Sequence, residues 1–148
     1  MFLLDTIVIS ELRKIRRGTA NAGVAEWADS VSAHELYLSS VTVEDIEWGI
    51  LLASRRDAVQ GLVLRAWLNQ HVLPAFGDRI LPVDTAVALC CAKLQVPDPL
   101  PYRDSLIAAT ALVHGMILVT RNTSDFVRSG AKLLNPWNDS GTLGAFGR

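Results

Sequence analysis

Short apolar runs that end at a polar residue alternate along this chain with stretches of helical periodicity, and this alternation limits the possible fold most strongly. The runs that we expect to be strands are residues 3–4, 36–38, 79–81, 117–119 and 133–134. Apolar residues at helical spacing predict helices over residues 8–15, 24–31, 41–53, 59–73, 87–94 and 105–114. Strands that alternate with helices pair in parallel, so the sequence predicts an α/β sandwich with a mainly parallel sheet.

Prolines, glycines and one aspartate set the expected ends of these elements. Pro74 is expected to end the long helix that precedes it, because proline disrupts a helix interior. The proline-rich segment 96–101 predicts a loop, after which Asp104 is expected to start a helix that Gly115 closes. The glycine-rich segment 138–148 is expected to be a mobile tail.

Length and composition predict a single globular domain. The chain has 148 residues, half of them hydrophobic, which is enough to bury a core. Its longest uncharged run, residues 105–120, is shorter than the ~20 residues that cross a bilayer. The first residues lack the pattern of a secretory signal, so we expect a cytoplasmic protein with no membrane partner. The net charge of −1 means that any binding of nucleic acid must come from local basic patches.

Acidic and amide side chains follow several of the predicted strands. Asp5 comes directly after the first strand, Asp104 opens a helix, and Asn122 and Asp125 follow the strand at residues 117–119. Asp45 lies on the helix after the second strand. Ligands of open parallel sheets bind beyond the carboxyl ends of the strands, so these side chains can face one crevice.

Each of these residues also has a simpler explanation, so the argument depends on the set. Asp5, Asp104 and Asp125 each precede a helical turn, where aspartate caps free backbone N–H groups. Asp45 alone could be an exposed helix residue. Carboxylates that converge without a basic partner repel one another, and a hard cation such as Mg²⁺ relieves that repulsion. The set therefore predicts an acid-only metal site that could act on a phosphodiester bond.

Other kinds of site find no support in the sequence. No glycine-rich phosphate loop and no nucleophile elbow is present. His34, His71 and His114 lack the spacing of a zinc site, and the adjacent Cys90 and Cys91 are expected to be small core residues.

Five motifs together resemble the PIN-domain ribonucleases, and more closely the VapC/FitB-like toxins of bacterial toxin–antitoxin pairs. The resemblance spans residues 1–137, in the family's order and spacing. The motifs are Leu3-Leu4-Asp5-Thr6-x-Val8-Ile9-Ser10-Glu11, Val41-Thr42-Val43, Tyr102-Arg103-Asp104-Ser105-Leu106-Ile107-Ala108-Ala109-Thr110-Ala111, Val119-Thr120-Arg121-Asn122-x-x-Asp125-Phe126 and Asn135-Pro136-Trp137.

The resemblance implies a PIN-like three-layer sandwich over residues 1–137, with a mainly parallel five-stranded sheet flanked by helices. It implies an endoribonuclease that depends on Mg²⁺ or Mn²⁺ and hydrolyses RNA through metal-activated water. It also implies two kinds of protein partner. A cognate VapB-like antitoxin would cover hydrophobic surface and push a basic side chain into the acidic site, and the chain would form a homodimer or a toxin–antitoxin hetero-oligomer.

The resemblance also implies roles for individual residues. Asp5 and Asp104 match the central metal ligands of the family, and Thr6 matches the hydroxyl residue beside the first of them. The second acidic ligand falls on Asp45 and not on the neighbouring Glu44. Asn122 and Asp125 match positions that act on the metal through water.

Two residues depart from the family pattern. Ile7 stands where the family has asparagine, and it cannot make a polar contact beside Asp5. Asp45 is one methylene shorter than the usual glutamate. These departures keep open a second reading, in which the chain is a degenerate PIN domain that binds RNA or an antitoxin without cutting. A DNA-directed or exonucleolytic relative is the third reading.

Basic residues near the predicted crevice are the candidates for contacts with RNA. Arg13, Lys14, Arg16 and Arg17 cluster at the end of the first helix, although such a charge run is often only a solvated face. Further candidates for phosphate contact or site support are Thr120, Arg121, Arg55 and Arg56. Phosphate contacts would make binding sensitive to salt without selecting a base sequence.

Overall fold

The computed structural model describes residues 1–137, which fold around a five-stranded sheet with the strand order β3-β2-β1-β4-β5. All four pairings are parallel. The strands are β1 (Phe2–Leu4), β2 (Leu36–Ser39), β3 (Ile80–Leu81), β4 (Ile117–Val119) and β5 (Leu133–Leu134). The predicted parallel five-stranded α/β fold is therefore confirmed. The predicted mobile tail, 138–148, lies outside the described residues.

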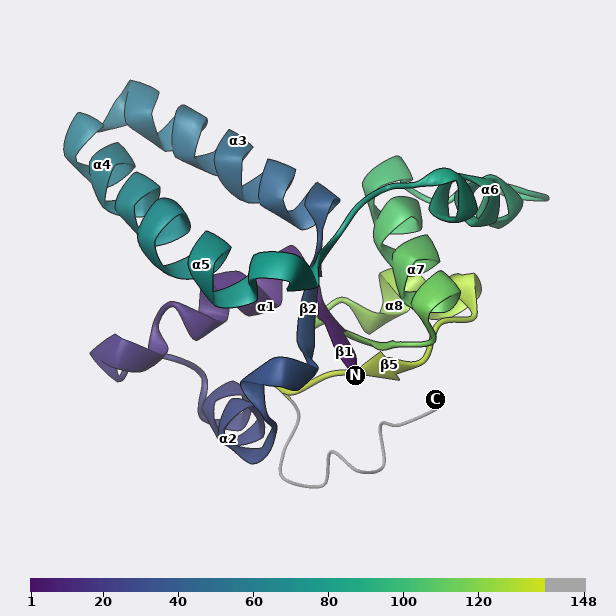
Figure 1. The fold of residues 1–148 in the computed structure, drawn as a ribbon, viewed down its shortest axis with the longest axis horizontal. Coiled ribbons are helices and arrows are strands. Elements are labelled where there is room, and N and C mark those ends of the chain that lie inside the picture. Colours follow the sequence, from purple (N-terminus) through teal and green to yellow (C-terminus); the bar gives the residue numbers. More distant parts are fainter. Residues whose placement is uncertain (138–148) are drawn as a thin grey trace.

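Helices cover both faces of the sheet, which gives the three layers that the sequence predicted (Figure 1). One face carries α1 (Thr6–Leu12), α2 (Ala22–Ser30) and α5 (Leu73–Phe76), with the hairpin of α3 (Ser40–Arg56) and α4 (Ala58–Trp67) extending from it. The other face carries α7 (Tyr102–His114) and α8 (Thr123–Phe126), and α6 (Thr85–Leu94) packs on the outside of α7. Short 3₁₀ turns occupy Ile15–Arg17, Ala33–Glu35, Gly77–Arg79 and Val127–Ser129.

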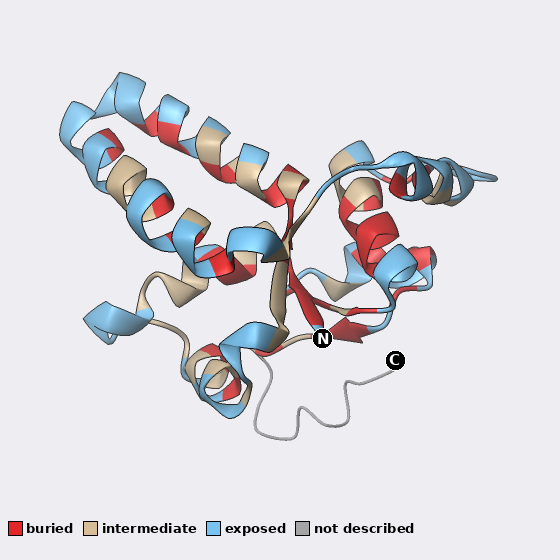
Figure 2. Ribbon diagram, viewed as in Figure 1, coloured by how far each residue is buried: buried red, intermediate tan, exposed pale blue. Residues whose placement is uncertain are grey.

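Alternation of side chains along the strands divides the core between the two faces. Phe2 and Leu4 of β1 point into the core under α1 and α2, whereas Leu3 points into the core under α7. Leu118 and Val119 of β4 divide in the same way, as the two-residue repeat of a strand requires. Buried residues accordingly lie on the central strands and on the inner sides of the helices (Figure 2).

The prediction that Pro74 ends the long helix is wrong. A π-helical turn over Leu68–Val72 follows α4, and in it the N–H of Leu73 bonds to the carbonyl of Leu68, five residues back. Proline inside a regular α-helix collides with the carbonyl four residues before it and lacks an N–H. Because the wider turn comes first, Pro74 fits into the first turn of α5, and the chain leaves the helix only at Gly77, which has a positive φ of 48°.

The predicted start of the helix at Asp104 is also wrong, and the correction bears on function. The helix begins at Tyr102, with Pro101 at the capping position, so Asp104 lies inside the first turn of α7. Its carboxylate makes no capping hydrogen bond there. The capping explanation of Asp104 is thereby removed.

The described helices also bear on the prediction of no membrane segment. Within residues 1–137, none of the helices combines the length and the apolar character that crossing a bilayer requires.

Candidate active site

The order of the strands creates a crevice beside β1. The chain builds β2 and β3 on one side of β1 and returns to build β4 and β5 on the other side. Such a reversal opens a gap at the carboxyl ends of the two central strands, where open α/β sheets bind ligands. Asp5 sits at this point, and its backbone N–H donates to the carbonyl of Val119 at 2.9 Å.

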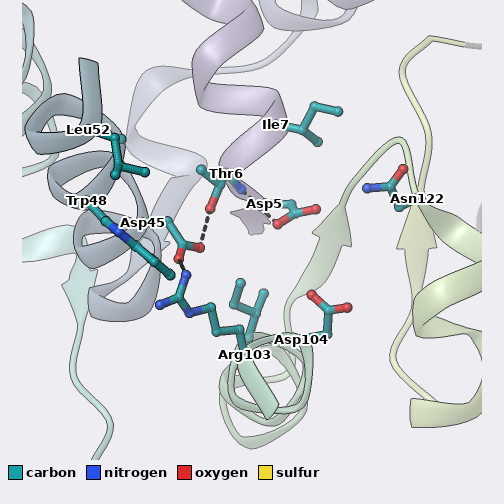
Figure 3. A pocket seen from close by; sticks show the side chains of 11 residues that line it. Asp5, Thr6, Ile7, Asp45, Trp48, Leu52, Arg103, Asp104 and Asn122 are labelled. Atoms are coloured by element: carbon teal, nitrogen blue, oxygen red, sulfur yellow. Dashed lines mark hydrogen bonds and ion pairs between the residues drawn. The ribbon is translucent and has the colours of Figure 1, made fainter. Parts of the chain in front are cut away.

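A pocket of about 530 Å³ opens at this reversal and brings three predicted acidic residues together (Figure 3). Asp5 comes from the end of β1, Asp45 from α3 and Asp104 from α7. The residues that line the pocket are Asp5, Thr6, Ile7, Asp45, Trp48, Gly49, Leu52, Arg103, Asp104, Ile107 and Asn122.

Asp5 is the most enclosed of these carboxylates, with a relative exposure of 8%. It caps α1, because one carboxylate oxygen accepts a hydrogen bond from the N–H of Thr6 at 2.8 Å. The other oxygen accepts the hydroxyl of Thr120 at 2.8 Å. Burial raises the pKa of Asp5, against the two hydrogen bonds, and the charges of Asp45 and Asp125 raise it further. Asp5 is thus both a cap and a carboxylate held at the pocket floor.

Thr120 ties the ends of β1 and β4 together. Its side chain is completely buried, donates to Asp5, and accepts the backbone N–H of Asn122 at 3.0 Å. The predicted supporting role of Thr120 therefore has a specific geometry. One hydroxyl orients the central carboxylate and also fixes the turn that carries Asn122.

Both oxygens of Asp45 have partners within the pocket. The hydroxyl of Thr6 donates to one oxygen at 2.9 Å, and the guanidinium of Arg103 donates to the other at 2.6 Å. Arg103 also lies over the ring of Trp48, 4.3 Å from its centroid. The expectation of an acid-only site is therefore wrong, because α7 brings a basic side chain into the pocket next to Asp104.

Of the three aspartates in the pocket, Asp104 is the one whose carboxylate forms no hydrogen bond within residues 1–137. Burial is the main cause of its raised pKa, and the charges of Asp5, Asp125 and Asp45 add to it in that order. A carboxylate that is partly desolvated and surrounded by like charge is stabilised by an added cation. Asp125 does not line the pocket, but its charge acts on both Asp5 and Asp104.

Three predicted basic residues do not line the pocket itself. Arg13 lines an adjoining hollow together with Thr6, Asp45 and Gly49. Lys14 lies just after α1 and is paired with Glu11 of that helix at 3.2 Å. Arg121 lies over the ring of Trp137 at 5.5 Å and does not line the pocket.

The donor set of the pocket suits a hard cation in its chemistry. Carboxylate and amide oxygens are the ligands that Mg²⁺ and Mn²⁺ prefer, and Asp104 has free lone pairs. Within residues 1–137, however, no three histidine, cysteine, aspartate or glutamate side chains are placed closely enough to hold an ion. The three aspartates share one pocket, but their role as metal ligands stays a prediction.

Sequence reasoning missed Arg103 and Trp48 as residues of this site. Arg103 is part of the quoted motif around Asp104, yet its charge beside a predicted ligand was given no role. Trp48 lies one turn after Asp45 on α3, and 48% of it is exposed. A basic residue next to one predicted ligand and an aromatic residue three positions after another could have suggested a pair across the pocket.

Comparison with known proteins identifies the family to which the chain belongs. The PIN domain family matches residues 2–131. The toxin FitB of Neisseria gonorrhoeae is 36% identical over 144 residues, which cover 94% of this chain and 100% of FitB. The VapC ribonuclease Y4jK of Sinorhizobium fredii is 36% identical, over 93% of this chain and 98% of its own length.

Structural comparison gives the same answer. The crystal structure of FitAcB from Neisseria gonorrhoeae superposes with a TM-score of 0.83 and 36% identity, covering 93% of this chain and 99% of that one. Sequence and fold agree over nearly the whole length of each chain. The chain belongs to the PIN domain family, among the VapC/FitB-like toxins of toxin–antitoxin systems.

Proposed function

We propose that the chain is a Mg²⁺- or Mn²⁺-dependent endoribonuclease, the toxin of a toxin–antitoxin pair. The observation that carries this proposal is the meeting of Asp5, Asp45 and Asp104 in one pocket at the reversal of strand order. The raised pKa values of Asp5 and Asp104 indicate a pocket that gains from a bound cation. A relative that is 36% identical is itself named a ribonuclease.

In this proposal the chain's own residues hold the ion and position its ligands. Asp5, Asp45 and Asp104 would hold it, and Asn122 and Asp125 would act through water. Thr120 and the N–H of Thr6 keep Asp5 oriented toward the pocket. When bound, the ion lowers the pKa of its water and stabilises negative charge on the scissile phosphate.

RNA contacts are assigned to the basic side of the pocket. Arg13 lines a hollow together with Thr6 and Asp45, and Lys14 follows it in the sequence, just after α1. Their contacts with phosphates would position an RNA strand without reading its bases. An RNA substrate places the activity in the cytoplasm.

The partner is proposed to be a VapB-like antitoxin, in a complex that also contains a toxin homodimer. Its support is the toxin name of the relative FitB and a run of exposed apolar side chains on the α3–α4 hairpin. Clustered apolar side chains on a surface mark sites of protein association. These residues are Trp48, Leu51, Leu52, Val59, Leu62 and Val63.

Cleavage of RNA with added Mg²⁺ or Mn²⁺ tests the proposal. The purified chain should cut single-stranded RNA internally, EDTA should stop the reaction, and a DNA strand of the same sequence should stay intact. Asp104→Asn should lose at least 100-fold in rate, on the order of the effect of removing one electrostatic contact to a transition state. Cutting of RNA in EDTA, or by Asp104→Asn at the same rate, would refute the metal mechanism.

The alternative, a degenerate domain that binds without cutting, is favoured by one observation. Ile7 lines the pocket beside Asp5 and, as an apolar side chain, offers no hydrogen bond there. Ile7→Asn should then raise the cleavage rate at least about 10-fold, since a hydrogen bond to a charged group contributes roughly 1.5–3 kcal/mol. Cleavage by Ile7→Asn no faster than by the parent chain would remove this explanation. RNA binding without any cleavage in either protein would support the binding module.

A further inference from the structure

Arg103 is the one pocket residue whose charge opposes the proposed cation. Its guanidinium donates to Asp45 at 2.6 Å and lies over Trp48, so it occupies the space between α7 and α3 (Figure 3). The side chain of Asp45 is only 18% exposed, whereas that of Arg103 is 40% exposed. The carboxylate is therefore held in the pocket, and the arginine reaches it from the solvent side.

We propose that Arg103 is an internal counter-ion that competes with the divalent cation for Asp45, so that binding of the cation displaces the guanidinium. This inference rests on the proposed metal-dependent function and concerns the same pocket. It assigns a role to a residue of the chain itself, next in sequence to the proposed ligand Asp104.

The hydrogen bonds of Asp45 are the first support. Thr6 takes one carboxylate oxygen and Arg103 takes the other, so in this state Asp45 has a partner on each side. A divalent cation and a guanidinium that bind the same carboxylate lie close together and repel each other strongly. Each therefore weakens the binding of the other to the carboxylate of Asp45.

The absence of a compact ligand cluster is the second support. Within the described part of the chain no three candidate ligands lie close enough for an ion, although three aspartates line one pocket. Figure 3 shows the carboxylate of Asp45 directed toward Arg103 and Thr6, with Asp104 on the other side of the arginine. Release of Arg103 would free Asp45 to turn toward Asp5 and Asp104.

Trp48 makes the displacement feasible. A cation over an aromatic face is stabilised without a carboxylate, and Trp48 presents a half-exposed ring 4.3 Å from the guanidinium. A partly exposed ion pair contributes little to stability, so a divalent cation can replace it. After release, Arg103 can stay on Trp48 at the edge of the pocket.

Metal affinity is the test that does not depend on catalysis. Titration calorimetry with Mn²⁺ compares the parent chain with Arg103→Gln, which removes the charge but keeps a long side chain on Trp48. We expect the Kd of Arg103→Gln for Mn²⁺ to be about 5-fold or more below that of the parent chain. A factor of about 5 is the lower end of the usual coupling between two ligands of one protein. Arg103→Lys should stay close to the parent, because it keeps the competing charge. Arg128→Gln is the matched control, since Arg128 is exposed and, within residues 1–137, its side chain donates a hydrogen bond to the carbonyl of Pro99 and forms no ion pair.

Trp48 provides a second readout that follows the arginine itself. The difference in tryptophan fluorescence between the parent chain and Trp48→Phe is the contribution of Trp48. In the parent chain Mg²⁺ should change that part, because the guanidinium moves on the ring. In Arg103→Gln the same titration should leave it unchanged.

The outcomes separate the two proposals. If Arg103→Gln binds Mn²⁺ as the parent and Arg128→Gln do, or more weakly, Arg103 is no competitor and this inference is wrong. If the parent does not bind Mn²⁺ but Arg103→Gln does, the inference holds in its strongest form. If no variant binds Mn²⁺, and Asp5→Asn behaves like the parent, the metal-dependent function itself fails and this inference fails with it.

Discussion

Thr120 shows how much of the site depends on single hydroxyl groups. It is buried at the end of β4, and it serves Asp5 and the backbone of Asn122 with one oxygen atom. The hydroxyl of Thr6, at the start of α1, donates to Asp45. Two threonines thus orient two of the three carboxylates, while Asp104 depends on neither.

Thr120→Val is predicted to weaken both the fold and the site. Valine keeps the shape but leaves an oxygen of Asp5 and the N–H of Asn122 without their partner. We expect a loss of about 2–3 kcal/mol in the free energy of unfolding in urea. The pKa of Asp5 should rise further, so Mn²⁺ binding should weaken at neutral pH. Thr120→Ser keeps the hydroxyl and should recover most of both; equal losses in the two variants would contradict this account.

The raised pKa of Asp104 predicts how stability varies with pH when no metal is present. A carboxyl group whose pKa is higher in the folded state binds its proton more tightly there, so stability falls as pH rises from 3.8 through the raised value. Asp104→Asn removes this charge. In EDTA at pH 7 it should melt about 1–3 °C above the parent, a modest gain because solvent screens a partly exposed group.

The melting difference of Asp104→Asn should close at low pH. Below pH 3.8 the parent aspartate is protonated in both states and resembles asparagine. Calorimetric scans from pH 3.5 to 7 measure this. A difference that is constant over the whole range would mean that Asp104 has an ordinary pKa.

Among the elements, the α3–α4 hairpin depends on one glycine. A Cβ added at Gly61 would lie 2.1 Å from the hydroxyl oxygen of Ser54 and 2.8 Å from its Cα, so the two helices approach too closely for a side chain. The hairpin carries Asp45 on its inner helix and the exposed apolar run on both helices. Its packing therefore matters to the pocket and to the proposed partner surface.

Gly61→Ala is predicted to destabilise the chain although alanine favours helices. Overpacking should outweigh the helix propensity gain of about 1 kcal/mol and leave a net loss of about 1–3 kcal/mol. Gly49→Ala is the matched control for stability. Gly49 is also helical but has open space around its Cβ position, so alanine there should be neutral or stabilising by up to about 1 kcal/mol. Urea denaturation measures the free energy of unfolding of both variants. Equal changes in Gly61→Ala and Gly49→Ala would contradict the packing argument.

At the scale of the whole molecule, charge is balanced overall but uneven locally. The net charge is −1, yet Arg13, Arg16 and Arg17 line one hollow, and Arg13 also lines the hollow that contains Thr6 and Asp45. Burial lowers the pKa of Arg13, and the charge of Arg17 adds to this effect. Arginine side chains that lie close together repel one another, and a bound phosphate would reduce that repulsion.

RNA binding is therefore predicted to depend on salt through this patch. Each phosphate contact contributes a slope of about −0.7 to log K against log salt for single strands. Arg13→Ala should reduce the slope by about that amount and weaken binding to all sequences alike. Arg128→Gln should leave the slope unchanged. Filter binding from low to high salt measures the slopes, with Asp104→Asn added to each protein to slow cleavage. Identical slopes with Arg13→Ala, with Arg128→Gln and with neither change would place the RNA elsewhere.

The sequence by itself determined the class of fold and the residues at the strand ends. The sequence directly shows features that depend on neighbouring residues. These features are strand periodicity, helix periodicity and the aspartates that follow apolar runs. The parallel sheet and the shared pocket of Asp5, Asp45 and Asp104 were predicted on that basis.

Only the tertiary structure decided where Arg103 points and how Pro74 is accommodated. The partner of Arg103 lies 58 residues away on another helix, and their contact depends on how α7 packs beside α3. Pro74 stays in a helix because a π turn precedes it, and no local propensity of that segment predicts such a turn. Both outcomes follow from the packing of distant segments, which a linear pattern does not record.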